Sequence, residues 1–310
     1  MSGGDPGALV TGSIFGFGVG EACALGAAAV WSTSIVLFRR SEALSAQGIN
    51  LFKNVSASLL LLATMPVLHL SFAGSRSGGD WLRLVVSGVL GIAIADTMIF
   101  SALRRLGAAR LAVVETAYTP TIVGLSVLFL DESVGPGFLV GGLLVVAGVL
   151  FAQERGAVRG GGGGSGPDAK GVMLGLGGMV AMAVGVVLAK PVLASGHLVE
   201  VTLVRLLAGV SGQAVWMALV PSERSALEAL KPNRTWWTLA PASFLGAYVA
   251  MLLWLGGFKW TGASTASVLN QMSTVFTIAL ARVWLGEPVT RARLMGAAMA
   301  VVGAILVIIT

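Results

Sequence analysis

The chain has 310 residues, of which 56% are hydrophobic, 11% are charged and 43 are glycine. Soluble globular proteins carry about 25% charged residues, so this composition excludes a soluble enzyme, a disordered chain and a secreted disulfide scaffold. The net charge of +6 is spread between long apolar runs, which favours basic loops facing anionic lipid over nucleic-acid binding. A single cysteine, Cys23, excludes an intramolecular disulfide, and two histidines are too few for a His-rich metal centre.

Ten windows along the chain are long and apolar enough to cross a bilayer, which takes about 20 mainly apolar residues. In chain order they cover 20–38, 49–70, 81–103, 109–130, 137–153, 171–189, 199–220, 236–258, 263–285 and 291–309. Trp81, Trp236 and Trp284 stand at window ends, where amphipathic rings favour the headgroup layer. We therefore expect an all-α polytopic membrane protein with ten transmembrane helices.

A glycine-rich segment divides these windows five and five. Residues 160–166 are glycine and serine and have no side chains with which to pack, which predicts a flexible linker. The halves also align, because a shift of 155 places Leu90-Gly91 on Leu245-Gly246 and Glu132 on Glu287. We expect one five-helix repeat over 1–153, a linker over 154–170 and a second repeat over 171–310. Since five is odd, the second repeat enters the membrane from the opposite side, and such inverted repeats are typical of secondary transporters.

Short motifs occur along the chain in a fixed order. Both halves have a basic residue early in the second window, Lys53 and Arg205, and a closing motif after the fourth, Leu130-Asp131-Glu132 and Leu285-Gly286-Glu287. The first half adds Trp31, Gly88 and Gly91, Ala102-Leu103 and Pro120. Together they resemble the EamA family of the drug/metabolite transporter superfamily. The chain departs from the family pattern at Ser32, where Gly is usual, at Asp131, which replaces the Gly of the closing motif, and at Val275, which replaces a proline.

Ionisable residues inside the apolar windows are functional candidates, because a charge at mid-bilayer costs ~2.5–3.5 kcal/mol. They are Lys53, Asp96, Glu115 and Arg205. Asp96 and Glu115 flank the turn at Arg105-Leu106 at equal spacing, which places both about 13 Å from it, and Lys53 enters the membrane on the same side. We expect a Lys53–Asp96–Glu115 cluster in which Asp96 and Glu115 are proton-coupling groups. The alternative is that Lys53 snorkels to the headgroups and Asp96 only pairs with it.

The other side chains expected to bind substrate are Asn54, Asn270 and Gln271, which offer hydrogen bonds, and the aromatic Trp31, Tyr118 and Trp254. The aromatic rings could stack on rings or cations in a cavity, with ordinary packing as the alternative. Arg205 could hold a carboxylate or phosphate, or pair with the nearby Glu200. Met251 and Asn270 stand where Asp96 and Glu115 would repeat, so any proton site is confined to the first half.

Two backbone features are expected at helix ends and breaks. Pro120 removes a helical hydrogen bond and is expected either to kink its helix or to have no effect. Asp131-Glu132 and Glu287 are expected to cap the helices that begin near Gly137 and Arg291.

We expect a secondary transporter that moves small organic metabolites, amino acids or related solutes, by alternating access. An exporter coupled to protons is our hypothesis. The chain has no GxxxxGK[ST] phosphate loop, and we expect neither an enzyme nor a bound metal or cofactor. The alternatives are a membrane scaffold or sensor and an intramembrane lipid-modifying enzyme. The expected partners are a small solute and the lipid bilayer of the cell membrane but not nucleic acid, with the chain a monomer or homodimer.

The distribution of positive charge predicts an orientation. Fourteen of the 20 Lys and Arg residues lie in odd-numbered loops and four in even loops and termini. Because positive loops stay in the cytoplasm, this bias puts both termini outside. The family resemblance implies both termini inside, so the two indications conflict.

Overall fold

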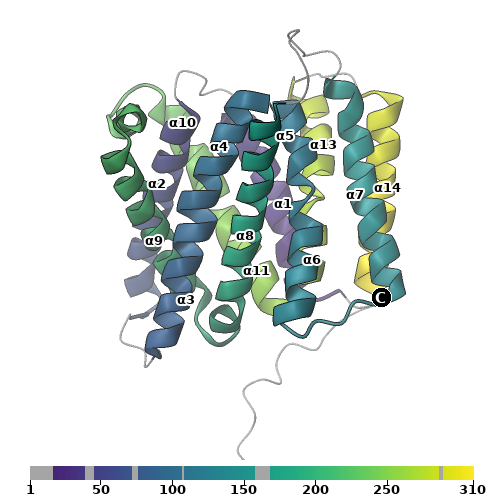
Figure 1. Cartoon of the computed structure of the whole chain (residues 1–310), viewed down its shortest axis with the longest axis horizontal. Helices are drawn as coiled ribbons and strands as arrows, with labels where there is room; N and C mark the ends of the chain where they lie inside the picture. Colours follow the sequence, from purple (N-terminus) through teal and green to yellow (C-terminus); the bar gives the residue numbers. More distant parts are fainter. Residues whose placement is uncertain (1–16, 39–44, 72–75, 107, 158–167, 286–288) are drawn as a thin grey trace, which may run out of the picture.

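The computed structural model describes residues 17–38, 45–71, 76–106, 108–157, 168–285 and 289–310. Arg39-Arg40, the glycine run 160–166 and Gly286-Glu287 lie outside the described residues. The described elements are all helices, and most of them stand side by side (Figure 1).

The described residues of the first half form seven α-helices and one π-helix, and those of the second half form the same set with an added 3-10 helix. The first comprises α1 (Val19–Phe38), α2 (Ala46–Val67), α3 (Gly78–Gly88), π-helix η1 (Val89–Ile94), α4 (Ala95–Leu106), α5 (Ala108–Glu115), α6 (Tyr118–Phe129) and α7 (Pro136–Ala157). The second comprises α8 (Ala169–Ser195), α9 (Leu198–Leu219), 3-10 helix η2 (Pro221–Leu230), α10 (Trp236–Ser243), π-helix η3 (Phe244–Val249), α11 (Ala250–Trp260), α12 (Ala263–Asn270), α13 (Ser273–Leu285) and α14 (Arg291–Ile309).

Every predicted window is occupied by helix. Within the part of the chain that the structure describes, six helical stretches are long and apolar enough to cross a membrane: Gln47–Val67, Gly78–Leu103, Ala169–Ser195, Leu198–Leu219, Trp236–Trp260 and Arg291–Ile309. Val113–Phe129 and Pro136–Ala152 are shorter apolar helices. The chain is therefore an all-helical, multi-pass membrane protein, while the count of ten spans stays a prediction.

The internal repeat is visible in the helix bounds. Adding 155 to the bounds of η1 gives those of η3, and adding 155 to the bounds of α5 gives those of α12. A shift of 152 likewise carries Ala46–Val67 onto Leu198–Leu219. Both halves thus place a π-helix in their third window and a break in their fourth, at positions that hydropathy alone does not mark.

The break in the fourth window is a turn at Thr116-Ala117, four residues before Pro120. Proline cannot donate to the carbonyl four residues earlier and its ring crowds that carbonyl, so the turn lies where Pro120 predicts a disturbance. Yet the second half breaks at Gln271-Met272, with Val275 in place of the proline. The break is therefore a property of the repeat, and Pro120 is not its sole cause.

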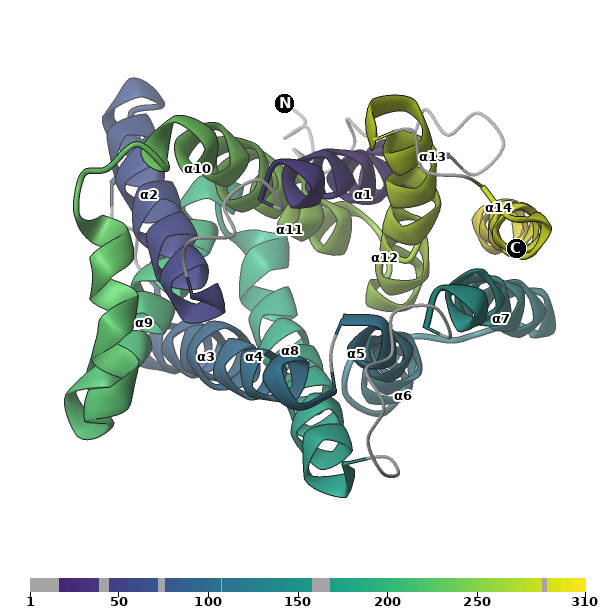
Figure 2. The same cartoon turned by 90° about the horizontal axis from the view of Figure 1, so that it is seen from above.

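Glycines set the contact between the fifth helices of the two halves, α7 and α14, which stand together at one end of the molecule (Figure 2). A Cβ added at Gly141 would lie 2.8 Å from the carbonyl oxygen of Gly303, and one at Gly148 would lie 2.5 Å from that of Gly296. Residue numbers rise along α7 as they fall along α14, because Gly141 meets Gly303 and Gly148 meets Gly296. The two helices therefore run antiparallel, as inverted repeats require. Only glycine allows backbones to approach this closely.

Away from α7 and α14, the two halves interlock. α8 of the second half packs on α3, α4 and α6 of the first, and α1 packs on α11, α12 and α13. The buried core along these contacts includes Leu84, Ile122, Leu255, Phe258 and Leu269. Each half therefore completes the core of the other.

Candidate functional site

The two helix breaks meet near the centre of this interlocked core. α6 packs on α12, and the side-chain amide of Gln271 donates to the hydroxyl of Thr119 at 2.9 Å. The same hydroxyl lies 3.3 Å from the carbonyl oxygen of Ser267. Tyr118 and Asn270, one residue before Thr119 and Gln271, are thereby brought to the same contact between the halves. A helix break leaves backbone groups without helical partners. The contact between the two breaks, called the junction below, is therefore a polar region within an apolar bundle.

Two buried polar atoms at the junction have no hydrogen-bond partner among the described residues. They are the hydroxyl of Tyr118 and the amide nitrogen of Asn270. Buried polar groups are nearly always paired, and each exception calls for an explanation. A bound solute would supply the partners that these two side chains lack.

Lys53 and Asp96 form a half-buried ion pair in the first half. The ammonium nitrogen lies 4.0 Å from Asp96 Oδ2 and 5.6 Å from the centre of the Trp31 ring. The side-chain amides of Asn50 and Asn54 are within reach of the same carboxylate, and Asn54 also lies 3.4 Å from Gln213 Oε1. Lys53 is therefore held between a carboxylate and an indole.

The structure does not bring Glu115 to this pair. Glu115 ends α5 and its side chain is exposed. Among the described residues, the ion pair of Lys53 is with Asp96 and not with Glu115. Equal depth fixes how far a residue lies along its helix, but it does not fix the direction in which its side chain points. Lys53 and Asp96 are together and Glu115 is separate.

Arg205 is almost completely buried in α9, with 2% of its surface exposed. Its Nε donates to the hydroxyl of Ser87 at 2.8 Å, and its guanidinium lies 6.0 Å from the centre of the Trp254 ring. Glu200, the alternative partner, instead pairs with Arg76 at 2.9 Å. The ion pair of Glu200 is therefore with Arg76 and not with Arg205.

Comparison of the chain with the sequence profiles of known families shows the family to which it belongs. The profile of the EamA-like transporter family matches residues 18–152 and again 169–309. The chain belongs to the EamA-like transporter family. This is a family of membrane transporters within the drug/metabolite transporter superfamily, as its motifs indicated.

Other comparisons with known proteins are less specific. No curated protein matches this EamA chain. One solved crystal structure is similar with a TM-score of 0.77 and 19% sequence identity, over 93% of this chain and 95% of that one. At this identity the likeness shows the shared fold alone.

Glu132 and Lys190 form a polar cluster at the start of α12. Glu132 was expected to cap the next helix, but its carboxylate accepts from the backbone N–H groups of Ala263 at 2.6 Å and Ser264 at 3.0 Å. It therefore caps α12 of the other half, because the interlocked fold brings that helix start closer than its own neighbour. Lys190 is one of the four basic residues that the charge count assigned to the even loops and termini. Its ammonium nitrogen lies 3.7 Å from the same carboxylate and donates to the carbonyls of Phe258 and Thr261.

Sequence reasoning also missed Ser87, Asn50 and Gln213, which are buried polar partners of the predicted residues. A signal for Asn50 was available, since it lies four residues before Asn54 and thus on the same helix face. Ser87 and Gln213 are single polar residues in apolar runs, and only the packing of α3 and α2 on α9 reveals what they contact.

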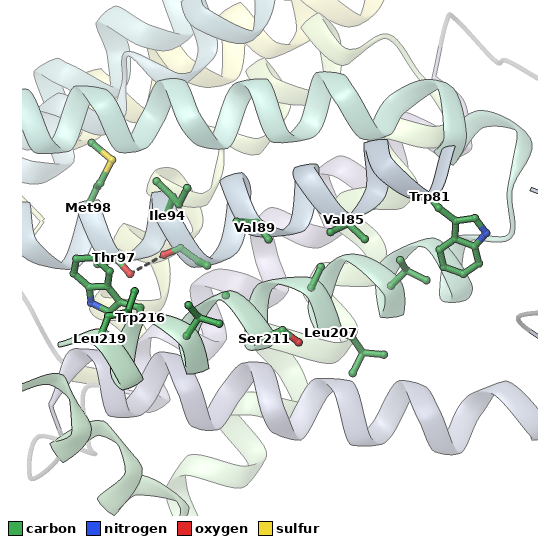
Figure 3. A pocket seen from close by; sticks show the side chains of 15 residues that line it. Trp81, Val85, Val89, Ile94, Thr97, Met98, Leu207, Ser211, Trp216 and Leu219 are labelled. Atoms are coloured by element: carbon green, nitrogen blue, oxygen red, sulfur yellow. Dashed lines mark hydrogen bonds between the residues drawn. The ribbon is translucent and has the colours of Figure 1, made fainter. Parts of the chain in front are cut away.

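A groove lies elsewhere, between α9 and the continuous stretch α3, η1 and α4 (Figure 3). It has a volume of about 780 Å³ and is lined by apolar side chains apart from Thr97 and Ser211, with Trp81 at one end and Trp216 at the other. Thr97 already donates to the carbonyl of Ala93. Such a lining suits lipid chains, so we do not place a polar solute there.

Proposed function

We propose that this EamA-like chain is a secondary transporter that exports small organic metabolites by alternating access between its two halves. The observation that carries the proposal is the junction of the two helix breaks, where Tyr118 and Asn270 each have a buried polar atom without a partner among the described residues. Secondary transporters with inverted repeats bind substrates near mid-membrane at interrupted helices. Asn54, Gln271, Trp31, Trp254, Lys53 and Arg205 complete the set of substrate-binding candidates.

We further propose that Asp96 carries the coupled proton. When Asp96 is ionised, it neutralises Lys53 at 4.0 Å; when it is protonated, Lys53 loses its counter-charge. An uncompensated charge in an apolar bundle is costly, so protonation favours a rearrangement of α2 against α4. Glu115, exposed at the helix break, remains a second candidate for the same role.

Flux into proteoliposomes tests both parts. Metabolite profiling of cells with and without the protein first selects the solute, and its flux is then measured with and without a pH gradient. We expect saturable counterflow in the wild type and in both variants. The pH gradient is expected to accelerate flux in the wild type but not in Asp96→Asn. Glu115→Gln, tested separately, is expected to keep the acceleration if Asp96 alone carries the proton.

The outcomes separate the alternatives. Absence of counterflow across a broad metabolite panel would remove the transport proposal and favour a scaffold or sensor. Counterflow with equal gradient dependence in wild type and Asp96→Asn would remove the proton role and leave transport in place.

A further inference from the structure

We propose that Arg205 binds a carboxylate of the transported solute, so that the substrates are singly charged carboxylates. This inference rests on the proposed transport function and specifies its substrate class. Four features of the site carry it: the burial of Arg205 without a counter-ion, the use of its donors, the unpartnered hydroxyl of Tyr118 and the number of charges present.

Arg205 lacks an internal counter-ion. Among the described residues no carboxylate lies within ion-pair distance of its guanidinium, and Glu200 on the same helix is engaged by Arg76. A guanidinium that is 2% exposed has lost its water and must find compensation elsewhere. Ser87 supplies only a neutral hydroxyl to Nε, and that hydroxyl in turn donates to the carbonyl of Gly185.

The terminal nitrogens of the guanidinium are the donors that Ser87 does not use. Nη2 lies beside Gly91, where an added Cβ would come within 3.5 Å of it, so a larger residue there would crowd this nitrogen. Arginine presents its terminal N–H groups as a fork that fits a carboxylate with two parallel hydrogen bonds. The structure leaves this fork unoccupied by any described carboxylate.

Tyr118 gives a second, independent indication of a ligand. Its side chain is 8% exposed, its hydroxyl has no partner, and it is close enough to Arg205 for the two groups to interact electrostatically. A carboxylate held by Arg205 would accept a third hydrogen bond, donated by the hydroxyl of Tyr118. The indole of Trp254 at 6.0 Å would border the rest of the solute.

The charge balance favours a carboxylate over a phosphate. One guanidinium compensates one negative charge, whereas a phosphomonoester carries nearly two at neutral pH. The second cation of the core, Lys53, is already matched by Asp96. The two basic positions thus differ, since the first half carries its own counter-ion and the second leaves that place to the solute.

Binding to the purified full chain in lipid nanodiscs tests the proposal without relying on flux. The probes are four carboxylates and their amides. Two pairs compare an anion with an uncharged amide: propionate and propionamide, phenylacetate and phenylacetamide. Two pairs compare an amino acid with an amide that keeps its ammonium group: alanine and alaninamide, phenylalanine and phenylalaninamide. Phenyl phosphate is added as the phosphate arm. Ligand that binds only the folded chain raises the melting temperature. We expect at least one acid to bind about tenfold or more tightly than its amide, as charge-assisted hydrogen bonds imply, and phenyl phosphate to bind no better than phenylacetate.

Three variants locate the effect. Arg205→Gln is expected to remove the preference for acid over amide, and Arg205→Lys to retain part of it. Tyr118→Phe removes only a hydroxyl and is expected to weaken acid binding about 3- to 10-fold while the amide is unaffected, which keeps the test valid if Arg205→Gln does not fold. Arg83→Gln, at an exposed arginine of α3, is the matched control and is expected to bind like wild type.

The proposal fails if no acid in the panel binds better than its amide, if Arg205→Gln or Tyr118→Phe keeps the full preference, or if phenyl phosphate is the tightest ligand. Transport itself would survive these results if a neutral or cationic solute shows counterflow. Acid binding without flux of any solute would instead remove the transport function and leave the site.

Discussion

Asp131 adopts a positive φ of 53° at the position where the family motif usually has glycine. A side chain in this left-handed region costs roughly 1–2 kcal/mol, less for Asp and Asn, whereas glycine adopts it freely but adds about 0.4–1 kcal/mol of unfolded-state entropy. Asp131→Gly is therefore expected to stabilise the protein by up to about 1 kcal/mol, seen as a higher melting temperature in detergent. Asp131→Asn, which tolerates the same backbone, is the control and should leave it unchanged. A lower melting temperature for Asp131→Gly would show that the Asp131 side chain stabilises the turn.

Single residues also show where sequence reasoning stops. Hydropathy identifies Lys53, Asp96 and Arg205 because a charge in an apolar run is conspicuous in one dimension. It does not choose their partners, since Glu200 lies five residues from Arg205 and yet pairs with Arg76 across the fold. Partner choice depends on helix rotation and packing, and neither is encoded in the spacing along one segment.

Helical elements were predictable where the bilayer imposes their length, and unpredictable where packing interrupts them. All ten windows contain helix, because an apolar run of bilayer length has no other way to satisfy its backbone. The π-helices and the turns at 116–117 and 271–272 change which side chains face one another. Glu115 was expected beside Asp96 from depth alone, and depth does not determine which way a side chain points.

The start of α12 depends on the carboxylate of Glu132. Glu132→Ala removes the acceptor of two backbone N–H groups and the charge facing Lys190, so we expect a loss of about 1–2 kcal/mol, the usual cost of losing a helix cap. Glu132→Gln keeps an oxygen acceptor and is expected to lose less. Chemical denaturation in detergent measures both. Equal stability of Glu132→Ala and wild type would mean that water caps α12 adequately.

At the scale of the whole molecule, α7 and α14 hold the ends of the two repeats together through paired glycines. Gly148→Leu places a side chain where a Cβ would already lie 2.5 Å from the backbone of Gly296. Overpacking typically costs about 1–3 kcal/mol, so the melting temperature and the yield of folded protein should both fall. Gly124→Leu on α6, where nothing lies within 4 Å of an added Cβ, is the matched control and should be tolerated. If both variants lose the same amount of stability, the cause is the leucine side chain itself and not the contact between α7 and α14.

The orientation of the molecule in the membrane follows from which face carries its positive charge. The end of α4 and the start of α8 lie on one face, while the C-terminus lies on the opposite face (Figure 1). The end of α4 carries Arg105, and the start of α8 carries Lys170. Arg105 also pairs with Asp168 at 3.1 Å, and this bond, with the Gly171 N–H, holds the pKa of Asp168 below its usual value. Because asymmetric positive charge sets topology, we expect the charged face in the cytoplasm and Thr310 outside. An alkaline phosphatase fused after Thr310 should then be active and a cytoplasmic reporter at the same place inactive. The reverse pattern would show that this chain inserts as family precedent indicates, with its charge bias overruled.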